Sequence, residues 1–279
     1  MILLVNDDGI DAPGLRALYA ALRSICGRPV LAVAPSHERS GQSHAITIDR
    51  ALTATARMSG DFFGFAIDGT PVDCVKLAIA RLCPTPPELV VSGINDGPNV
   101  GRSIFYSGTL GAAMEAAIAG LPALAASRAR GADEVVDPAG ARLNDPRFPA
   151  ESRFADGAAL TADLARKLLA AAPRPGRVVS LNIPAGPATG WRPLRLARHA
   201  LGGFVETYAP QSTGDGRTQW VLDGAWSTTA SSAAEADDAA LLSAGHPVVT
   251  TLRPDVNDDA GLATLAPALG KAHRAEDPR

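Results

Sequence analysis

A short apolar run that ends in two adjacent carboxylates is the feature of this sequence that most restricts its fold. Ile2–Val5 contains only aliphatic side chains, and Asn6, Asp7, Asp8 and Gly9 follow it directly. An uninterrupted apolar run of this length is typical of a strand buried on both faces, as in a parallel sheet covered by helices. The sequence therefore predicts that Asp7 and Asp8 lie at the carboxyl end of a central strand.

A helix and a second apolar run follow this strand. Asp11 and Pro13 are typical helix-start residues, and apolar side chains then recur at helical spacing as far as Leu22. Val30–Ala34 is again continuously apolar, and Pro35 ends it. Strand, helix and strand within roughly 35 residues predict a βαβ unit with parallel strands.

The rest of the chain repeats these patterns, so we expect an α/β fold with a mostly parallel sheet and helices on both faces. Thr70 and Pro71 form a typical helix start, and Gly120 is a typical helix end. The expected strands are Ile46–Thr55 and Phe62–Ile67 as an antiparallel pair, Leu89–Val91, Leu121–Ser127, Val178–Ile183 and Val248–Leu252, and the expected helices are 71–82, 108–119 and 158–172.

After Pro184 the pattern changes to short β-like pieces separated by turn residues, which predicts hairpins that project from the main body. These pieces are Arg192–Arg195, Val205–Tyr208 and Gln219–Leu222. Residues 129–152 are expected to form a surface loop, 230–244 a surface helix or loose loop, and the charged tail from Lys271 a frayed end.

Composition excludes several classes of function. The net charge of −3 over 279 residues gives no broad positive surface for a nucleic-acid polymer or an anionic membrane. The chain has three cysteines and no CxxC pair, which argues against a disulfide framework or a cysteine zinc site. No signal peptide begins the sequence and no apolar stretch reaches the ~18 residues of a membrane span, so a cytoplasmic location is expected.

Polar loops that follow buried strands offer candidate metal ligands. Besides Asp7 and Asp8, the loop after the second strand carries Ser40, and the glycine-rich Ser92–Gly101 carries Asn95. Ligands bind at this edge of open α/β sheets, and carboxylate, amide and hydroxyl oxygens suit Mg²⁺, Mn²⁺ or Ca²⁺. A solvated Asp-Asp turn and an ordinary glycine-rich loop are the alternatives.

A candidate phosphate site lies at the expected helix start Ser107, Gly108 and Thr109, because free N–H groups at a helix start attract anions. The Gly41 amide and Asn99 are further candidates for binding phosphate oxygens. Plain helix capping by the hydroxyl residues is the alternative. His44 is either a proton shuttle or a solvated loop histidine.

These residues resemble the SurE survival-protein family of metal-dependent nucleotidases. The order and spacing of six segments over most of residues 1–127 follow that family. They are NDDGI at Asn6–Ile10, APSHERSG at Ala34–Gly41, SHAITI at Ser43–Ile48, GTPVDCVKLA at Gly69–Ala78, SGINDGPNVG at Ser92–Gly101 and YSGTLGAAMEAA at Tyr106–Ala117. The likeness weakens after Asn182–Pro184, and Ser103 stands where family members usually carry an acidic residue.

The resemblance implies a Rossmann-like catalytic domain over residues 1–185. Residues 186–279 would form a C-terminal hairpin part that builds a homodimer or homotetramer, with a last strand at 247–254 returning to the sheet. It implies one divalent cation per subunit on Asp7, Asp8, Ser40 and Asn95. The implied substrates are nucleoside 5′- or 3′-monophosphates, with short polyphosphate in some members.

The predicted reaction is phosphomonoester hydrolysis, with Asp8 as the group that accepts a proton from water. A haloacid-dehalogenase-type phosphatase needs carboxylates two positions apart, whereas Asp7 and Asp8 are adjacent. A calcium-dependent nucleoside hydrolase and a nucleotide- or metal-binding module without turnover stay open. No sugar-nucleotide signature supports a glycosyltransferase, and no GxGxxG supports a dinucleotide-dependent oxidoreductase.

Overall fold

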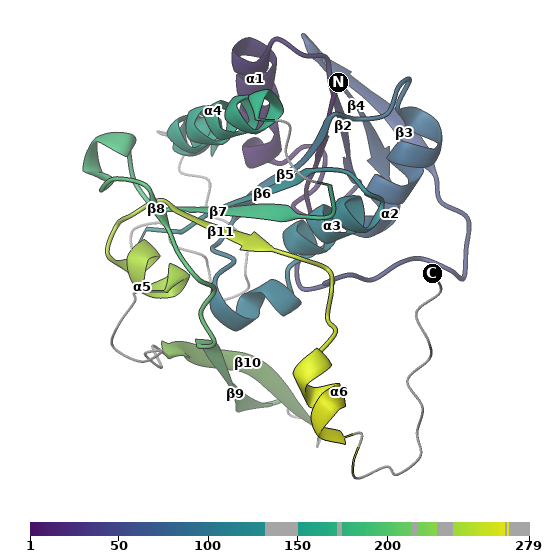
Figure 1. Ribbon diagram of the computed structural model, residues 1–279. Coiled ribbons are helices and arrows are strands. Elements are labelled where there is room, and N and C mark those ends of the chain that lie inside the picture. Colours follow the sequence, from purple (N-terminus) through teal and green to yellow (C-terminus); the bar gives the residue numbers. More distant parts are fainter. Residues whose placement is uncertain (132–149, 172–174, 214–216, 228–236, 266, 268–279) are drawn as a thin grey trace.

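The computed structural model describes residues 1–131, 150–171, 175–213, 217–227, 237–265 and 267, and its body is one nine-stranded sheet (Figure 1). The strand order is β3-β4-β2-β1-β5-β6-β7-β11-β8. Its strands are β1 (Ile2–Val5), β2 (Val30–Pro35), β3 (Ala54–Ser59), β4 (Phe62–Ile67), β5 (Leu89–Asp96), β6 (Ala123–Arg128), β7 (Val178–Ile183), β8 (Arg195–Leu196) and β11 (Val248–Leu252).

The central strands of this sheet are parallel, which confirms the predicted α/β fold. β1 lies between β2 and β5 and is parallel to both, and β6 and β7 continue the parallel pairing. β3 pairs antiparallel with β4, and β11 pairs antiparallel with β7. The carboxyl ends of β1, β2 and β5 therefore meet at one edge of the sheet.

Helices cover both faces of the sheet (Figure 1). The helices of the main body are α1 (Pro13–Cys26), α2 (Pro71–Leu77, continued by a π-helical turn at Ala78–Leu82), α3 (Gly108–Ile118), α4 (Ala155–Ala170) and α5 (Asp238–Ser243). Ile2 and Leu4 belong to the core under α1 and α4, and Leu3 and Val5 belong to the core under α2 and α3. Because both faces are covered, β1 has no polar position, which explains the continuous apolar run.

One predicted strand was placed wrongly. Ile46–Thr55 was expected to pair with β4, but the strand that does so is Ala54–Ser59. The preceding residues are held by side chains instead: the Thr70 hydroxyl donates to the Ala45 carbonyl, and the Thr47 hydroxyl donates to Asp73 at 2.6 Å. These contacts tie the segment to the start of α2, so its alternating apolar residues do not form a strand.

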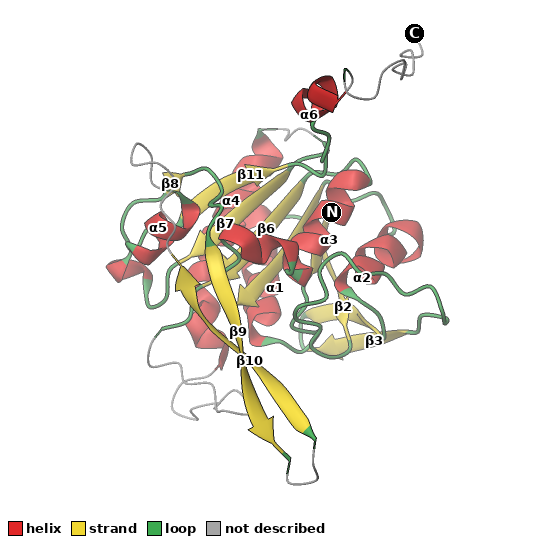
Figure 2. Ribbon diagram, turned by 90° about the horizontal axis from the view of Figure 1, so that it is seen from below, coloured by secondary structure: helices red, strands yellow, loops and turns green. Residues whose placement is uncertain are grey.

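The C-terminal part contains the predicted hairpin. β9 (Gly203–Ser212) and β10 (Thr218–Ser227) pair antiparallel and extend away from the sheet as a two-stranded arm (Figure 2). A short helix, α6 (Asp259–Leu265), follows β11. The expected piece Arg192–Arg195 does not project as part of a hairpin: the strand found there is β8 (Arg195–Leu196), which pairs parallel with β11 at the edge of the main sheet. The division of the chain at residue 185 stays a prediction.

The surface loop expected at 129–152 lies largely outside the described residues, and the tail from Lys271 lies wholly outside them. The segment 230–244 is described from residue 237 on, and there α5 (Asp238–Ser243) forms the helix that was one of its two expected structures. In the part of the chain that is described, none of the helices has the length and apolar character to cross a membrane.

Candidate active site

A tight turn at the end of β1 presents the two carboxylates. The Asn6 side chain is fully buried, donates to the Gly9 carbonyl at 2.9 Å and accepts from the Gly9 amide at 3.2 Å. Gly9 has φ +105°, a conformation that favours glycine. Asn6 therefore fixes the backbone from which Asp7 and Asp8 project.

Asp7 lies against the first turn of α3. The Thr109 hydroxyl donates a 2.5 Å hydrogen bond to Oδ1 of Asp7. A Cβ atom on Gly108 would lie 2.8 Å from Cβ and 2.9 Å from Oδ2 of Asp7, so only glycine fits there. The positive end of the helix dipole thus faces the buried Asp7 carboxylate.

The environment of Asp7 makes its negative charge costly. Burial, followed by repulsion from the Asp8 carboxylate, raises the pKa of Asp7 to about 7, while the Thr109 hydrogen bond lowers it. A buried carboxylate that is repelled by a neighbouring one is an arrangement that a bound cation stabilises.

Asp8 is joined to the end of β5. The Asp96 amide donates to Oδ2 of Asp8 at 3.2 Å, which brings the neighbouring Asn95 to the same edge of the sheet. The Asn95 amide nitrogen donates to the Gly97 carbonyl at 2.7 Å. The side-chain oxygen of Asn95 is therefore its candidate ligand atom.

The loop after β2 passes beside the same turn. The Arg39 amide donates to the Asp7 carbonyl at 2.7 Å, so Ser40 and Gly41 follow within two residues of this contact. The Ser40 hydroxyl donates to Glu38 at 2.8 Å, and both Ser40 and Gly41 are exposed. Gly41 has φ +75° and open space where a side chain would stand.

The start of α3 differs in detail from the sequence prediction. Ser107 is the N-cap, and its hydroxyl oxygen accepts from the Leu110 amide at 3.0 Å. The Thr109 hydroxyl, expected to bind phosphate, donates its hydrogen to Asp7 instead. Thr109 thus orients a candidate metal ligand, while the Ser107 hydroxyl hydrogen and the Gly108 amide remain candidates for an anion.

Asn99 makes its hydrogen bonds farther along the sheet. Its side chain donates to the Ser127 hydroxyl at 2.8 Å, and its amide donates to Asn182 at 2.8 Å. These contacts tie the glycine-rich loop to the ends of β6 and β7. The Ser103 hydroxyl, where the family usually has an acidic residue, donates to the Val100 carbonyl at 2.5 Å.

The donor set at the end of β1 fits a hard divalent cation. Two carboxylates, Asp7 and Asp8, stand beside the segments that carry the Asn95 amide oxygen and the Ser40 hydroxyl, and oxygen ligands are those that Mg²⁺, Mn²⁺ and Ca²⁺ take. Within the described residues no cluster of three His, Cys, Asp or Glu side chains could hold a metal. A cation site would therefore combine these two carboxylates with neutral oxygens.

Sequence reasoning missed three residues: Asn6 and Asp96, whose contacts hold the turn that carries Asp7 and Asp8, and Glu115, which bonds to the candidate His44. Only the role of Asn6 had a signal in the sequence. An Asn at the start of a turn that contains glycine often forms hydrogen bonds from its side chain to the backbone of that turn. The Asp96 amide reaches Asp8 only through the pairing of β1 with β5. Glu115 is a carboxylate in an apolar helix, and its partner His44 is 71 residues away.

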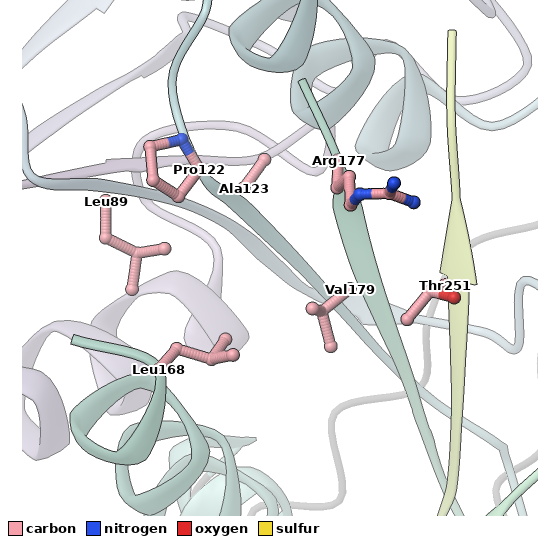
Figure 3. A pocket seen from close by; sticks show the side chains of 7 residues that line it. All are labelled: Leu89, Pro122, Ala123, Leu168, Arg177, Val179 and Thr251. Carbon is pink, nitrogen blue, oxygen red and sulfur yellow. The ribbon is translucent and has the colours of Figure 1, made fainter. Parts of the chain in front are cut away.

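A hollow of about 390 Å³ lies at the other end of the sheet (Figure 3). Leu89, Ala123 and Val179 near the starts of β5, β6 and β7 line it, together with Leu168 and Arg177. It is therefore remote from the carboxylates, which follow the carboxyl end of β1.

Comparisons with known proteins agree with this fold. The family model "Survival protein SurE" matches residues 2–204. The 5′-nucleotidase SurE of Desulfovibrio desulfuricans is 39% identical over 264 residues, which are 95% of this chain and 96% of that protein. The 5′/3′-nucleotidase SurE of Edwardsiella ictaluri is 36% identical over 278 residues, 98% of this chain and 97% of that protein.

A solved structure supports the same conclusion. The crystal structure of the SurE protein from Aquifex aeolicus aligns with a TM-score of 0.76 and 28% identity, covering 96% of this chain and 99% of that one. The family match spans β1, the loop after β2, β5 and the start of α3, the elements that build the candidate site. The chain belongs to the SurE family.

Proposed function

We propose that this protein hydrolyses nucleoside 5′-monophosphates, and 3′-monophosphates as a further substrate, to nucleoside and inorganic phosphate. The observation that carries the proposal is the Asp7–Asp8 pair at the end of β1, with Asp7 held on the start of α3 by the 2.5 Å hydrogen bond from Thr109. The relatives named 5′-nucleotidase and 5′/3′-nucleotidase, which match nearly the whole chain, support the same reaction.

Asp7, Asp8, Ser40 and Asn95 would hold one divalent cation per subunit, with Mg²⁺, Mn²⁺ and Ca²⁺ as the candidates. When bound, such a cation supplies positive charge to the phosphoryl group and lowers the pKa of water. The protein's part is to hold both carboxylates in a fixed orientation. Thr109 does this for Asp7, and the Asp96 amide does it for Asp8.

In the proposed reaction a water oxygen forms a new bond to phosphorus while the bond from phosphorus to the nucleoside oxygen breaks. Asp8 accepts a proton from the attacking water, and the nucleoside oxygen leaves as a hydroxyl after gaining a proton. Asp8 suits this role because it is less buried than Asp7 and because the Asp96 amide orients one of its oxygens.

The phosphate oxygens would be bound by the Gly41 amide, the Ser107 hydroxyl, the Gly108 amide and Asn99. Donors fixed before the substrate arrives stabilise charge that develops in the transition state. Thr109 contributes through Asp7, which its hydroxyl orients. The apolar hollow in Figure 3 takes no part.

The β9–β10 arm supports the proposal of a homodimer, alone or within a tetramer. Tyr208, Trp220 and Leu222 lie on one face of the arm, since Tyr208 pairs with Leu222 and Trp220 with Pro210. Their exposed fractions are 64%, 62% and 57%. An apolar face of this kind favours burial against a second subunit. A cytoplasmic location stays a prediction from the sequence.

The test is phosphate release from a panel of nucleoside 5′- and 3′-monophosphates, p-nitrophenyl phosphate and short polyphosphate. Each substrate is incubated with EDTA, Mg²⁺, Mn²⁺ or Ca²⁺. We expect release from nucleoside monophosphates that depends on a divalent cation. Free base and ribose without phosphate would indicate a nucleoside hydrolase, and binding without any product would indicate a binding module.

A further inference from the structure

The loop that carries Ser40 and Gly41 has its anchoring contacts at its ends. Both residues are exposed, and the Ser40 hydroxyl bonds to Glu38 of the same loop. Just before these two residues, the loop is fixed by the Arg39 amide, which donates a hydrogen bond to the Asp7 carbonyl at 2.7 Å. The position of Ser40 and Gly41 relative to Asp7 therefore also depends on what holds the loop after them.

After Gly41 the loop crosses the first turns of α3. The Ser43 amide donates to the Tyr106 carbonyl at 3.1 Å, and its hydroxyl donates to the Phe105 carbonyl at 2.6 Å. A Cβ atom on Gly111 would lie 2.3 Å from the Ser43 carbonyl oxygen, so backbone passes directly over helix at this point. Ser43 itself has φ +53°, a strained conformation for a residue with a side chain.

The Glu115 carboxylate holds the loop at the point where it crosses α3. His44 Nε2 donates to Oε2 of Glu115 at 2.8 Å, and Lys76 Nζ donates to Oε1 of the same group at 2.9 Å. Glu115 is largely buried and projects from α3, while Lys76 lies on the adjoining α2. Burial raises the pKa of Glu115, but the hydrogen bonds from His44 and Lys76 outweigh it and hold the pKa below its ordinary value.

The location of Glu115 decides what His44 does. Glu115 lies seven residues beyond Gly108, which is roughly 10 Å along a helix. Gly108 marks the end of α3 that faces Asp7. The His44 ring therefore forms its hydrogen bond with a group that lies well along the helix from Asp7 and Asp8. This position suits a histidine that holds the loop on α3 and argues against a histidine that carries protons for the reaction.

We propose that Glu115 is a positioning residue that, through its hydrogen bond with His44, holds the loop bearing Ser40 and Gly41 in place beside Asp7. The inference rests on the proposed function, because it assumes that this loop contacts cation and phosphate. Loss of the Glu115 charge should loosen the loop, weaken the affinity for the divalent cation and raise KM, with a smaller effect on kcat.

The test compares Glu115→Gln with Glu88→Gln as a matched control. Glu88 also forms ion pairs with two positively charged groups, the Met1 ammonium group at 2.6 Å and the Arg28 side chain at 3.3 Å. It lies just before β5, at the end of the sheet opposite the candidate site. Hydrogen–deuterium exchange of residues 39–47 is measured without added cation or substrate. Mn²⁺ affinity is measured by titration calorimetry, and kcat and KM are measured for a nucleoside monophosphate.

For Glu115→Gln we expect exchange at Arg39 and Ser43 to quicken roughly tenfold and Mn²⁺ affinity to fall by a similar factor, as for loss of one charged hydrogen bond. Glu88→Gln should leave both unchanged. Unaltered exchange and affinity in Glu115→Gln would overturn the inference. So would His44→Asn if it abolished kcat while loop exchange stayed as in the wild type, because that result indicates proton transfer.

Failure of the proposed function gives a different pattern. If the wild-type protein releases no phosphate with any cation, the assigned reaction is wrong. The exchange and Mn²⁺ measurements then still decide whether Glu115 positions the loop.

Discussion

The Thr109 hydroxyl donates a 2.5 Å hydrogen bond to the Asp7 carboxylate, so the first turn of α3 is fixed on the residue that follows β1. Thr109 is fully buried and Asp7 is 3% exposed. The hydrogen bond joins the two elements that frame the candidate site, and it ties the position of α3 to the orientation of a candidate metal ligand.

Thr109→Val should lower Mn²⁺ affinity and kcat/KM by roughly tenfold or more, because it removes a hydrogen bond to a charged group worth about 1.5–3 kcal/mol. Calorimetry and steady-state kinetics check this. Thr161→Val is the control: Thr161 is equally buried, but its hydroxyl donates to Gly157 within α4, on the opposite face of the sheet. Equal losses in both variants would show that Thr109 acts only through stability.

Gly108→Ala should reduce activity although alanine favours helices by about 1 kcal/mol over glycine. The new methyl group would lie 2.8 Å from Cβ of Asp7 and would displace that side chain. Gly157→Ala in α4 is the matched control, since its methyl group would meet only side-chain ends, the nearest at 3.3 Å. Wild-type activity in Gly108→Ala would contradict the close fit of Asp7 on α3.

Asp73 should make folding stability depend on pH in the acid range. Burial raises the Asp73 pKa, but hydrogen bonds from Thr47 and Thr70 outweigh it, so the folded-state pKa is lower than the ordinary value. The ionised group therefore stabilises the fold above the unfolded-state pKa of about 3.9, and this contribution is lost as pH falls through the folded-state pKa.

Asp73→Asn measures this contribution. Denaturant unfolding at pH 7 should show a free energy of unfolding lower than the wild type by about 2 kcal/mol, as expected when hydrogen bonds to a charged group are lost. At pH 3 the difference should shrink. A difference that is the same at both pH values would mean that the Asp73 charge does not contribute.

The β9–β10 arm should control the oligomeric state. Sedimentation of the wild-type protein is expected to give at least twice the chain mass of 28.6 kDa. Replacing Tyr208 and Trp220 by serine removes two exposed aromatic side chains from one face of the arm and should shift the protein toward the monomer. A monomeric wild-type protein would refute the proposed dimer.

Much of the fold could be predicted because buried parallel strands have a simple sequence pattern. Ile2–Val5, Phe62–Ile67, Val178–Ile183 and Val248–Leu252 were predicted with the bounds that the structure has. Ile46–Thr55 was misplaced because Asp73 and Thr70, distant in sequence, hold that segment away from the sheet.

The site was predictable only in part. Asp7 and Asp8 stand out because carboxylates directly after a buried strand are unusual. The partner of Thr109 could not be read from sequence: a hydroxyl at a helix start bonds equally well to a phosphate, to its own helix or to a carboxylate 102 residues away. Asn99 likewise finds Ser127 and Asn182 only when β6 and β7 lie side by side.

The most direct test of the account is phosphate release from a nucleoside 5′-monophosphate over a range of Mn²⁺ concentrations, for the wild type, Asp8→Asn and the surface control Asp163→Asn. Asp163 lies on α4 and pairs with Arg166 and Lys167. We predict release that requires Mn²⁺, falls at least roughly a hundredfold in Asp8→Asn and is unchanged in Asp163→Asn. Release by Asp8→Asn at the wild-type rate, or by the wild type in EDTA, would contradict the account.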